Sequence, residues 1–195
     1  SNMKTSLFCA LAIIALAQPS FAAKQLIVGS ATLEGVVADA IDQAKLSTAL
    51  TYEGNGSGNG EDALIAGTQG IAPMSRAMKA DAIAKLPAGV KAVEHVIGLD
   101  GIGVFVNSGN KIMSMDLDTV RGIFTCTITD WSQVRGATAT GAIVVYARDA
   151  KSGTTDAFKA LTGIKNFGTC LKGQFDSGDD IATRTSSEIN AIGFA

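Results

Sequence analysis

The chain has 195 residues, of which 47% are hydrophobic and 17% are charged, and this composition excludes a chain that is disordered as a whole. The formal net charge is −2, so the chain lacks the basic excess that nucleic-acid binding requires, and no nucleic-acid partner is expected. The 22 glycines predict many tight turns, or many places where the backbone must approach another group closely.

The first 22 residues are expected to lie outside the fold. Ser1 and Asn2 precede Met3 and are interpreted as residues left by cloning. One lysine, an apolar run of 11 residues at 7–17 and a break with small residues then follow the order of a secretory signal peptide, cleaved after Ala22. The apolar run is too short to span a bilayer. The sequence therefore predicts a periplasmic protein, and a buried N-terminal helix is the alternative.

Up to residue 106 the chain alternates between apolar runs, glycine-rich loops and segments with helical spacing. Short apolar runs that end in glycine are typical of buried parallel strands, and apolar residues every three or four positions are typical of helices. The expected elements are a strand at 24–29, a helix at 33–46, a strand at 49–52, a helix at 61–67, a strand at 70–74 and an extended segment at 93–106.

The second half of the chain continues this alternation. The expected elements are a helix at 116–124, a strand at 143–146, a helix at 155–161 and the beginning of a strand at 191–195. Strands that alternate with helices favour the α/β class with a largely parallel sheet.

Two cysteines, Cys126 and Cys170, follow the expected signal peptide. An even number in an exported protein favours one disulfide, and two unpaired thiols are the alternative. His95 is the only histidine and no two cysteines have metal-binding spacing, so neither a zinc site nor a cofactor is expected.

Three loops share one design, in which a strand is followed by glycine and hydroxyl residues and then by a helix. They lie at 29–32, 56–60 and 152–154. A helix N-terminus offers unpaired backbone N–H groups and the positive end of the helix dipole, and glycine lets an anion reach that backbone. A single loop of this kind is usually only a helix cap. Three of them in one chain predict an anion site.

Two arginines lie next to these hydroxyl-rich segments. Arg148 lies four residues before Ser152, and Arg76 follows Ser75 directly. A guanidinium group can bind two oxygens of an oxyanion at once, so both arginines are candidates for the site. The alternative for each is a solvated arginine on the surface.

Eight short motifs of the chain, in this order, resemble the periplasmic phosphate-binding protein of bacterial phosphate ABC transporters. The motifs are Gly29-Ser30-Ala31-Thr32, the glycine-rich loop 54–60, Met74-Ser75-Arg76, Asp100-Gly101-Ile102, Ile123-Phe124, Thr129-Asp130-Trp131, Arg148 to Thr154 and Ile192-Gly193-Phe194. The resemblance covers essentially the whole chain after the expected signal peptide.

The resemblance implies the type II periplasmic binding fold, in which two α/β lobes joined by hinge strands enclose the ligand. The implied boundaries are lobe one at 23–95, a hinge crossover at 96–105, lobe two at 106–190 and the start of a return strand at 191–195. It also implies a monomer that binds phosphate and delivers it to an ABC permease. The residues expected at the anion are Thr32, Leu33, Ser57, Ser75, Arg148, Ser152, Gly153 and Thr154, with Arg76 as a further candidate.

The chain departs from the family pattern in two places. Some members have an aspartate near Ser75-Arg76 that accepts the proton of protonated phosphate, and Arg76 stands near that position here. Asp149 or Asp156 could take over as the acceptor. Members also continue beyond the Ile-Gly-aromatic motif and return to lobe one, so this return is expected to be missing or short.

Other functions remain open at this point. An enzyme is not expected, because the glycine-rich loop lacks the lysine of a P-loop, no Gly-x-Ser-x-Gly elbow occurs, and His95 is the only possible imidazole base. The alternatives are a receptor for another oxyanion, such as sulfate or molybdate, and a phosphate sensor without a transport role.

Overall fold

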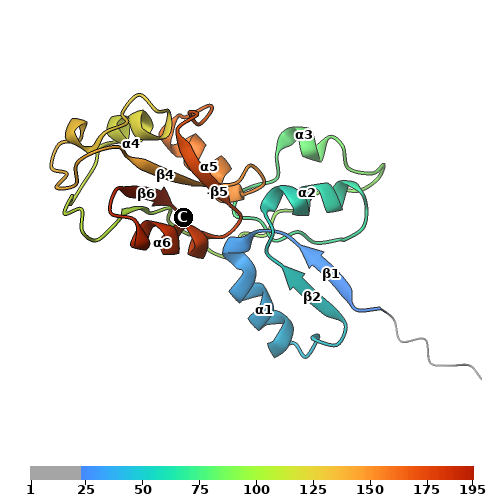
Figure 1. Cartoon of the computed structure of the whole chain (residues 1–195). Coiled ribbons are helices and arrows are strands. Elements are labelled where there is room, and N and C mark those ends of the chain that lie inside the picture. The colour runs from blue at the N-terminus through green and yellow to red at the C-terminus, as the bar shows by residue number, and fades with distance from the viewer. Residues whose placement is uncertain (1–22) are drawn as a thin grey trace, which may run out of the picture.

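The structure is a computed structural model of the chain, and it describes residues 23–195. The expected signal peptide lies outside the described residues. The elements form two groups that lie next to each other (Figure 1). The elements up to residue 83 make up the first unit, and those from residue 104 onward make up the second.

Two parallel strands form the sheet of the first unit, β1 (Gln25–Val28) and β2 (Leu50–Glu53). Parallel strands need a crossover, which here is a 3-10 turn at Ala31–Leu33 followed by α1 (Glu34–Gln43). Both predicted strands and the helix between them are therefore confirmed. The first strand and the helix are shorter than the apolar pattern indicated, and the second strand is shifted by one residue.

The glycine-rich loop leads directly into α2 (Ser57–Ile65), so the helix predicted at 61–67 begins earlier than expected. Gly56, immediately before this helix, has a φ of +121°, which favours glycine. A short helix, α3 (Ala80–Ile83), completes the first unit. The loop and the start of α2 thus carry Ser57 to the edge of the first unit.

The prediction of a strand at 70–74 is wrong, because this segment forms neither helix nor strand. The side-chain amide of Gln69 occupies the backbone groups of β1 that such a strand would need. It accepts a hydrogen bond from the N–H of Val28 at 3.0 Å and donates one to the carbonyl of Val28 at 2.9 Å. Pro73 has no N–H to pair with a neighbouring strand. A side chain therefore replaces the strand ladder that the apolar pattern predicted.

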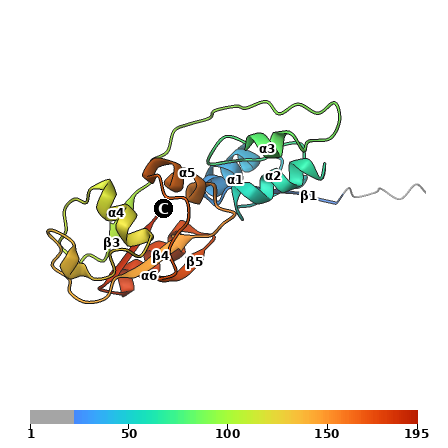
Figure 2. The same ribbon diagram turned by 90° about the horizontal axis from the view of Figure 1, so that it is seen from above.

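A long connection joins the two units, and Figure 2 shows it running from α3 to the second unit. Residues 91–103 form no helix or strand, and of the predicted extended segment 93–106 only β3 (Val104–Val106) is a strand. Apolar side chains of the connection, such as Val93 and Leu99, are exposed.

The second unit contains a four-stranded sheet with the order β3-β6-β4-β5. The added strands are β4 (Val144–Arg148), β5 (Leu171–Phe175) and β6 (Ala191–Phe194). β4 is parallel to both β5 and β6, whereas β3 is antiparallel to β6. The segment expected to begin a return strand is therefore an inner strand of this sheet.

Three helices cover the second sheet, with α4 (Leu117–Phe124) and α5 (Gly153–Thr162) on one face and α6 (Gly178–Ser187) on the other (Figure 1). The main core lies under α4 and α5, where the rings of Phe158 and Phe194 stack with their centroids 3.9 Å apart. Within residues 23–195, none of the helices has the length and apolar character needed to cross a membrane.

The disulfide between Cys126 and Cys170 is confirmed, with their Cα atoms 5.8 Å apart. It joins the end of α4 to the start of β5, across a sequence separation of 44 residues. The bond therefore lies within the second unit and holds a helix to an edge strand of the sheet.

Candidate functional site

The loop between β4 and α5 is shaped by hydrogen bonds to side chains within it. Asp149 accepts hydrogen bonds from the N–H groups of Lys151 and Ser152 at 2.9 and 2.8 Å. Ser152 caps α5 by accepting a hydrogen bond from the N–H of Thr155 at 3.3 Å. The loop thus sets the N-terminus of α5 at the carboxyl end of a buried parallel strand, which is where open α/β sheets bind ligands.

Four hydroxyl side chains meet at this helix N-terminus, one from α5 and three from the first unit. The hydroxyl oxygens of Thr32 and Thr154 are 3.1 Å apart, and those of Ser57 and Ser75 are 3.3 Å apart. A Cβ atom at Gly153 would collide with the hydroxyl oxygens of both serines. The structure therefore brings five of the predicted site residues together where the two units touch.

Ser57 is held in place by the backbone as well as by its partner side chain. Its hydroxyl oxygen accepts a hydrogen bond from the N–H of Ser75 at 3.1 Å, and its side chain is fully buried. The next residue, Gly58, donates its N–H to the carbonyl of Lys151 at 3.0 Å. The glycine-rich loop of the first unit therefore packs directly against the loop that precedes α5.

Arg148 lies at the carboxyl end of β4 and is 3% exposed. Its Nε donates to the carbonyl of Phe175 at 3.3 Å, and its Nη2 donates to the carbonyl of Asp176. No carboxylate of residues 23–195 forms an ion pair with it. Burial lowers the pKa of Arg148, although the charges of Asp149 and Asp176 oppose this shift. The guanidinium nevertheless stays charged, so β4 ends in a buried cation that forms no ion pair with a carboxylate of the described residues.

Arg76 is not placed with the hydroxyl groups, because two carboxylates bind it. Its Nη1 and Nη2 donate to both oxygens of Glu61 at 2.6 and 2.9 Å, and its Nε donates to Asp156 at 2.6 Å. Lys79 lies 2.9 Å from the same oxygen of Asp156. Burial raises the pKa of Glu61, but hydrogen bonds from Arg76 and the N–H of Lys79 outweigh it and hold that pKa below its ordinary value.

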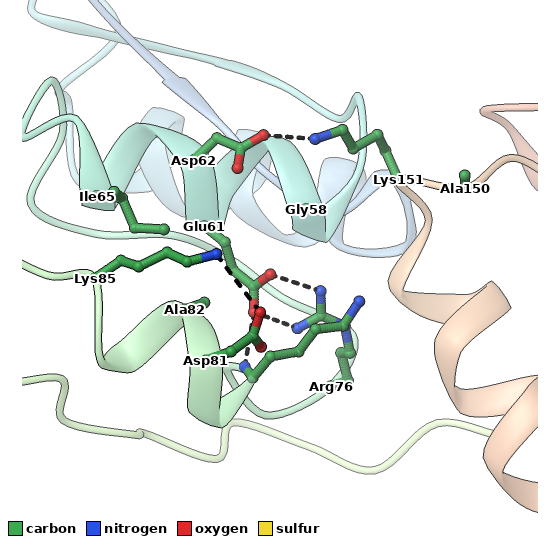
Figure 3. Close-up of a pocket in the computed structure, with 11 residues that line it drawn as sticks. Gly58, Glu61, Asp62, Ile65, Arg76, Asp81, Ala82, Lys85, Ala150 and Lys151 are labelled. Carbon is green, nitrogen blue, oxygen red and sulfur yellow. Dashed lines mark hydrogen bonds and ion pairs between the residues drawn. The ribbon is translucent and has the colours of Figure 1, made fainter.

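Arg76, Glu61 and Lys79 line a pocket of about 260 Å³ (Figure 3). Lys151 reaches into it from the second unit and pairs with Asp62 at 2.5 Å. Glu61, Asp62 and Lys79 were not identified from the sequence. Their partners lie up to 89 residues away along the chain, and a charge carries no sequence signal for a partner at that distance.

The remaining candidates occupy supporting positions. The N–H of Leu33 donates to the carbonyl of Ser30 at 3.2 Å, so this N–H is used within the turn before α1. His95 is exposed on the connection between the units. Among residues 23–195, no group of three His, Cys, Asp or Glu side chains is arranged to hold a metal ion.

Comparison with known proteins identifies the family. Residues 17–194 match the family model described as a PBP superfamily domain. The chain belongs to the PBP superfamily. This confirms the resemblance to phosphate-binding proteins that the loop motifs indicated.

Solved structures of phosphate-binding proteins share the α/β fold over most of the chain. A structure from Clostridium perfringens, described as a phosphate ABC transporter substrate-binding protein with bound phosphate, is 26% identical, with a TM-score of 0.76. The alignment covers 88% of this chain and 69% of that one. An ABC-type phosphate transport receptor from Vibrio cholerae has the same fold, with 24% identity and a TM-score of 0.64 over 88% of this chain and 70% of that one.

A curated relative carries a different name. A Pseudomonas aeruginosa protein called alkaline phosphatase L is 30% identical in an alignment of 106 residues, and the match covers 47% of this chain. The match spans only 27% of that relative's length. The solved relatives named above are binding proteins, whereas this curated relative is named as an enzyme.

Proposed function

We propose that this PBP-superfamily protein is a periplasmic receptor that captures phosphate for an ABC importer. The observation that carries the proposal is the buried guanidinium of Arg148, which has no carboxylate partner within residues 23–195. A buried charge without a partner is costly, and a bound anion would compensate it. The name of the Clostridium perfringens relative, which includes bound phosphate, supports phosphate as that anion.

The groups at the N-terminus of α5, which begins five residues after Arg148, suit a tetrahedral oxyanion. The N-terminus of α5 offers backbone N–H groups and the positive end of the helix dipole. Hydroxyl groups add donors, and each hydroxyl can also rotate to accept the proton of protonated phosphate. We propose that the anion contacts Thr32, Ser57, Ser75, Arg148, Ser152, Gly153 and Thr154. Leu33 is left out of this set, because its N–H is used within the turn before α1. Arg76 is left out of this set, because Glu61 and Asp156 bind its guanidinium.

The two units correspond in this proposal to the two lobes of a type II periplasmic binding protein. Lobe one would span 23–95, the hinge crossover 96–105 and lobe two 106–190, and the strand at 191–194 would pass through lobe two before any return. The hydroxyl groups of Thr32, Ser57 and Ser75 come from one lobe, and Thr154 comes from the other. Ligand binding between the lobes would therefore favour a closed arrangement.

Binding without hydrolysis is the activity that we propose. The site offers donors that hold an anion, and the only histidine lies exposed on the connection between the units. The enzyme name of the Pseudomonas aeruginosa relative makes hydrolysis of a phosphate ester the second candidate.

Calorimetry of the purified protein with phosphate, sulfate, arsenate and molybdate tests the proposal. Phosphate and arsenate should bind with similar enthalpies and at one site per chain. An assay with p-nitrophenyl phosphate in the same buffer should show no turnover above background. Binding of molybdate in preference to phosphate would show that phosphate is not the ligand. Steady turnover of p-nitrophenyl phosphate would show that the protein is an enzyme.

A further inference from the structure

The segment that carries the N-terminus of α5 forms ion pairs with the first unit both before and after Gly153 and Thr154 in the chain. On one side, Lys151 pairs with Asp62 at 2.5 Å. On the other side, Asp156 pairs with Arg76 at 2.6 Å and with Lys79 at 2.9 Å. All three ion pairs connect side chains of the second unit to side chains of the first. Separation of the two units would break all of them.

The pairs made by Asp156 differ from the pair made by Lys151 in their exposure to water. The side chains of Arg76, Glu61 and Asp156 are 11%, 7% and 26% exposed. The side chains of Lys151 and Asp62 are both more than half exposed. Exposed ion pairs are screened by water and salt and contribute little, whereas a shielded network keeps more of its attraction. Asp156 is therefore the residue that joins the units most strongly by charge.

Arg76 would remain paired if Asp156 lost its charge. Glu61 belongs to the same unit as Arg76 and accepts two of its hydrogen bonds. A neutral side chain at position 156 would therefore leave no arginine unpaired in the first unit. Such a change should weaken the contact between the units without unfolding either of them.

We propose that Asp156 is a positioning residue that holds the two units closed around the anion and slows its release. This inference rests on the proposed function, because it concerns the same site. Asp156 lies in the first turn of α5, beyond Gly153 and Thr154, and therefore pulls the helix N-terminus toward Ser57 and Ser75. A receptor that is closed for a larger fraction of the time has a proportionally lower apparent Kd.

Stopped-flow measurement of phosphate release tests the inference with two variants and one matched control. Asp156→Asn should release phosphate about 5-fold faster or more, the lower end of typical coupling between sites. Its association rate should change much less than its release rate. Asp156→Glu should restore slow release in part, because it keeps the charge. Asp81→Asn is the control, since Asp81 pairs with Lys85 within the first unit, beside the same pocket.

Salt provides a second readout that a merely structural role would not change. The side chain of Lys79 is 46% exposed, so salt can screen its pair with Asp156. Release from the wild type and from Asp81→Asn should therefore speed up with rising ionic strength, and release from Asp156→Asn should respond less. If Asp156→Asn releases phosphate at the wild-type rate and with the wild-type salt dependence, the inference is overturned.

X-ray scattering of the ligand-free proteins separates this inference from the proposed function. Asp156→Asn should have a larger radius of gyration than the wild type and Asp81→Asn, whichever anion the protein binds. Equal radii for the three proteins would also overturn the inference. Failure of the wild type to bind phosphate would instead overturn the proposed function.

Discussion

Individual residues of the site were partly predictable from the sequence. The hydroxyl groups and glycines of three helix-capping loops could be recognised because their role depends on the residues next to them. The partners of Arg76 could not be recognised, because Glu61 and Asp156 are 15 and 80 residues away along the chain. Local chemistry is visible in a sequence, whereas long-range ion pairing depends on how the two units meet.

Gly153 offers a sharp test of the hydroxyl cluster. Gly153→Ala would push a methyl group into the hydroxyl oxygens of Ser57 and Ser75, so the two units could not approach as closely. We expect phosphate affinity measured by calorimetry to fall at least tenfold, which corresponds to about 1.4 kcal/mol.

Gly35→Ala is the matched control for that substitution. Gly35 lies inside α1, where an added Cβ would meet no atom within 4 Å apart from its chain neighbours and the backbone of its own helix. This change should stabilise the first unit by up to about 1 kcal/mol and leave affinity unchanged. Equal phosphate affinity in both variants would show that binding of the anion does not depend on close contact at Gly153.

Selectivity between anions depends on whether a carboxylate accepts a proton from the ligand. Asp149 accepts from two backbone N–H groups, and Asp156 is bound by Arg76 and Lys79. With both acidic candidates engaged in this way, we expect phosphate to be preferred over sulfate by less than about 10³-fold, or about 4 kcal/mol.

Competition titrations with the wild type, Asp149→Asn and Asp156→Asn measure this preference. If one aspartate accepts the ligand proton after all, the preference should be much larger and should collapse in the corresponding variant. Strong rejection of sulfate that survives both substitutions would contradict the account of the site.

At the scale of elements, the sequence predicted those whose local signals agree with their packing. α5 has a serine cap at its start and Gly163 at a φ of 73° at its end, and its Phe158 packs in the core, although Leu161 is exposed. β5 and α6 were not predicted. The sequence of β5 includes Lys172, Gly173 and Gln174, and the only apolar residue that α6 buries is Ile181. Their structure follows from pairing with β4 and packing on the sheet, which local patterns do not reveal.

The disulfide is the covalent element that stabilises the second unit. The double variant Cys126→Ser/Cys170→Ser removes a crosslink between positions 44 residues apart. In the chain-entropy model this loss should cost about 3–4 kcal/mol of the free energy of unfolding. Urea denaturation of oxidised wild type and variant measures the difference. An unchanged urea midpoint would show that the bond contributes no net stability.

At the scale of the whole molecule, the two units meet through polar contacts. The hydroxyl pair of Thr32 and Thr154, the hydrogen bond from Gly58 to Lys151 and the ion pairs of Asp156 all lie between them. Polar contacts of this kind can open and re-form at low cost, which suits a receptor that must release its ligand. The motifs predicted the two-unit architecture, but they did not predict the ion pairs that join the units.

The central claim is that a bound anion compensates the buried charge of Arg148, and calorimetric titration with phosphate tests it directly. Arg148→Ala should lose about 2–5 kcal/mol of binding free energy, because one buried charge-assisted partner is removed. Arg135→Ala is the control, since Arg135 is an exposed arginine of the same unit. A large loss of affinity in Arg148→Ala alone is the predicted result, and wild-type affinity in a folded Arg148→Ala protein would contradict the account.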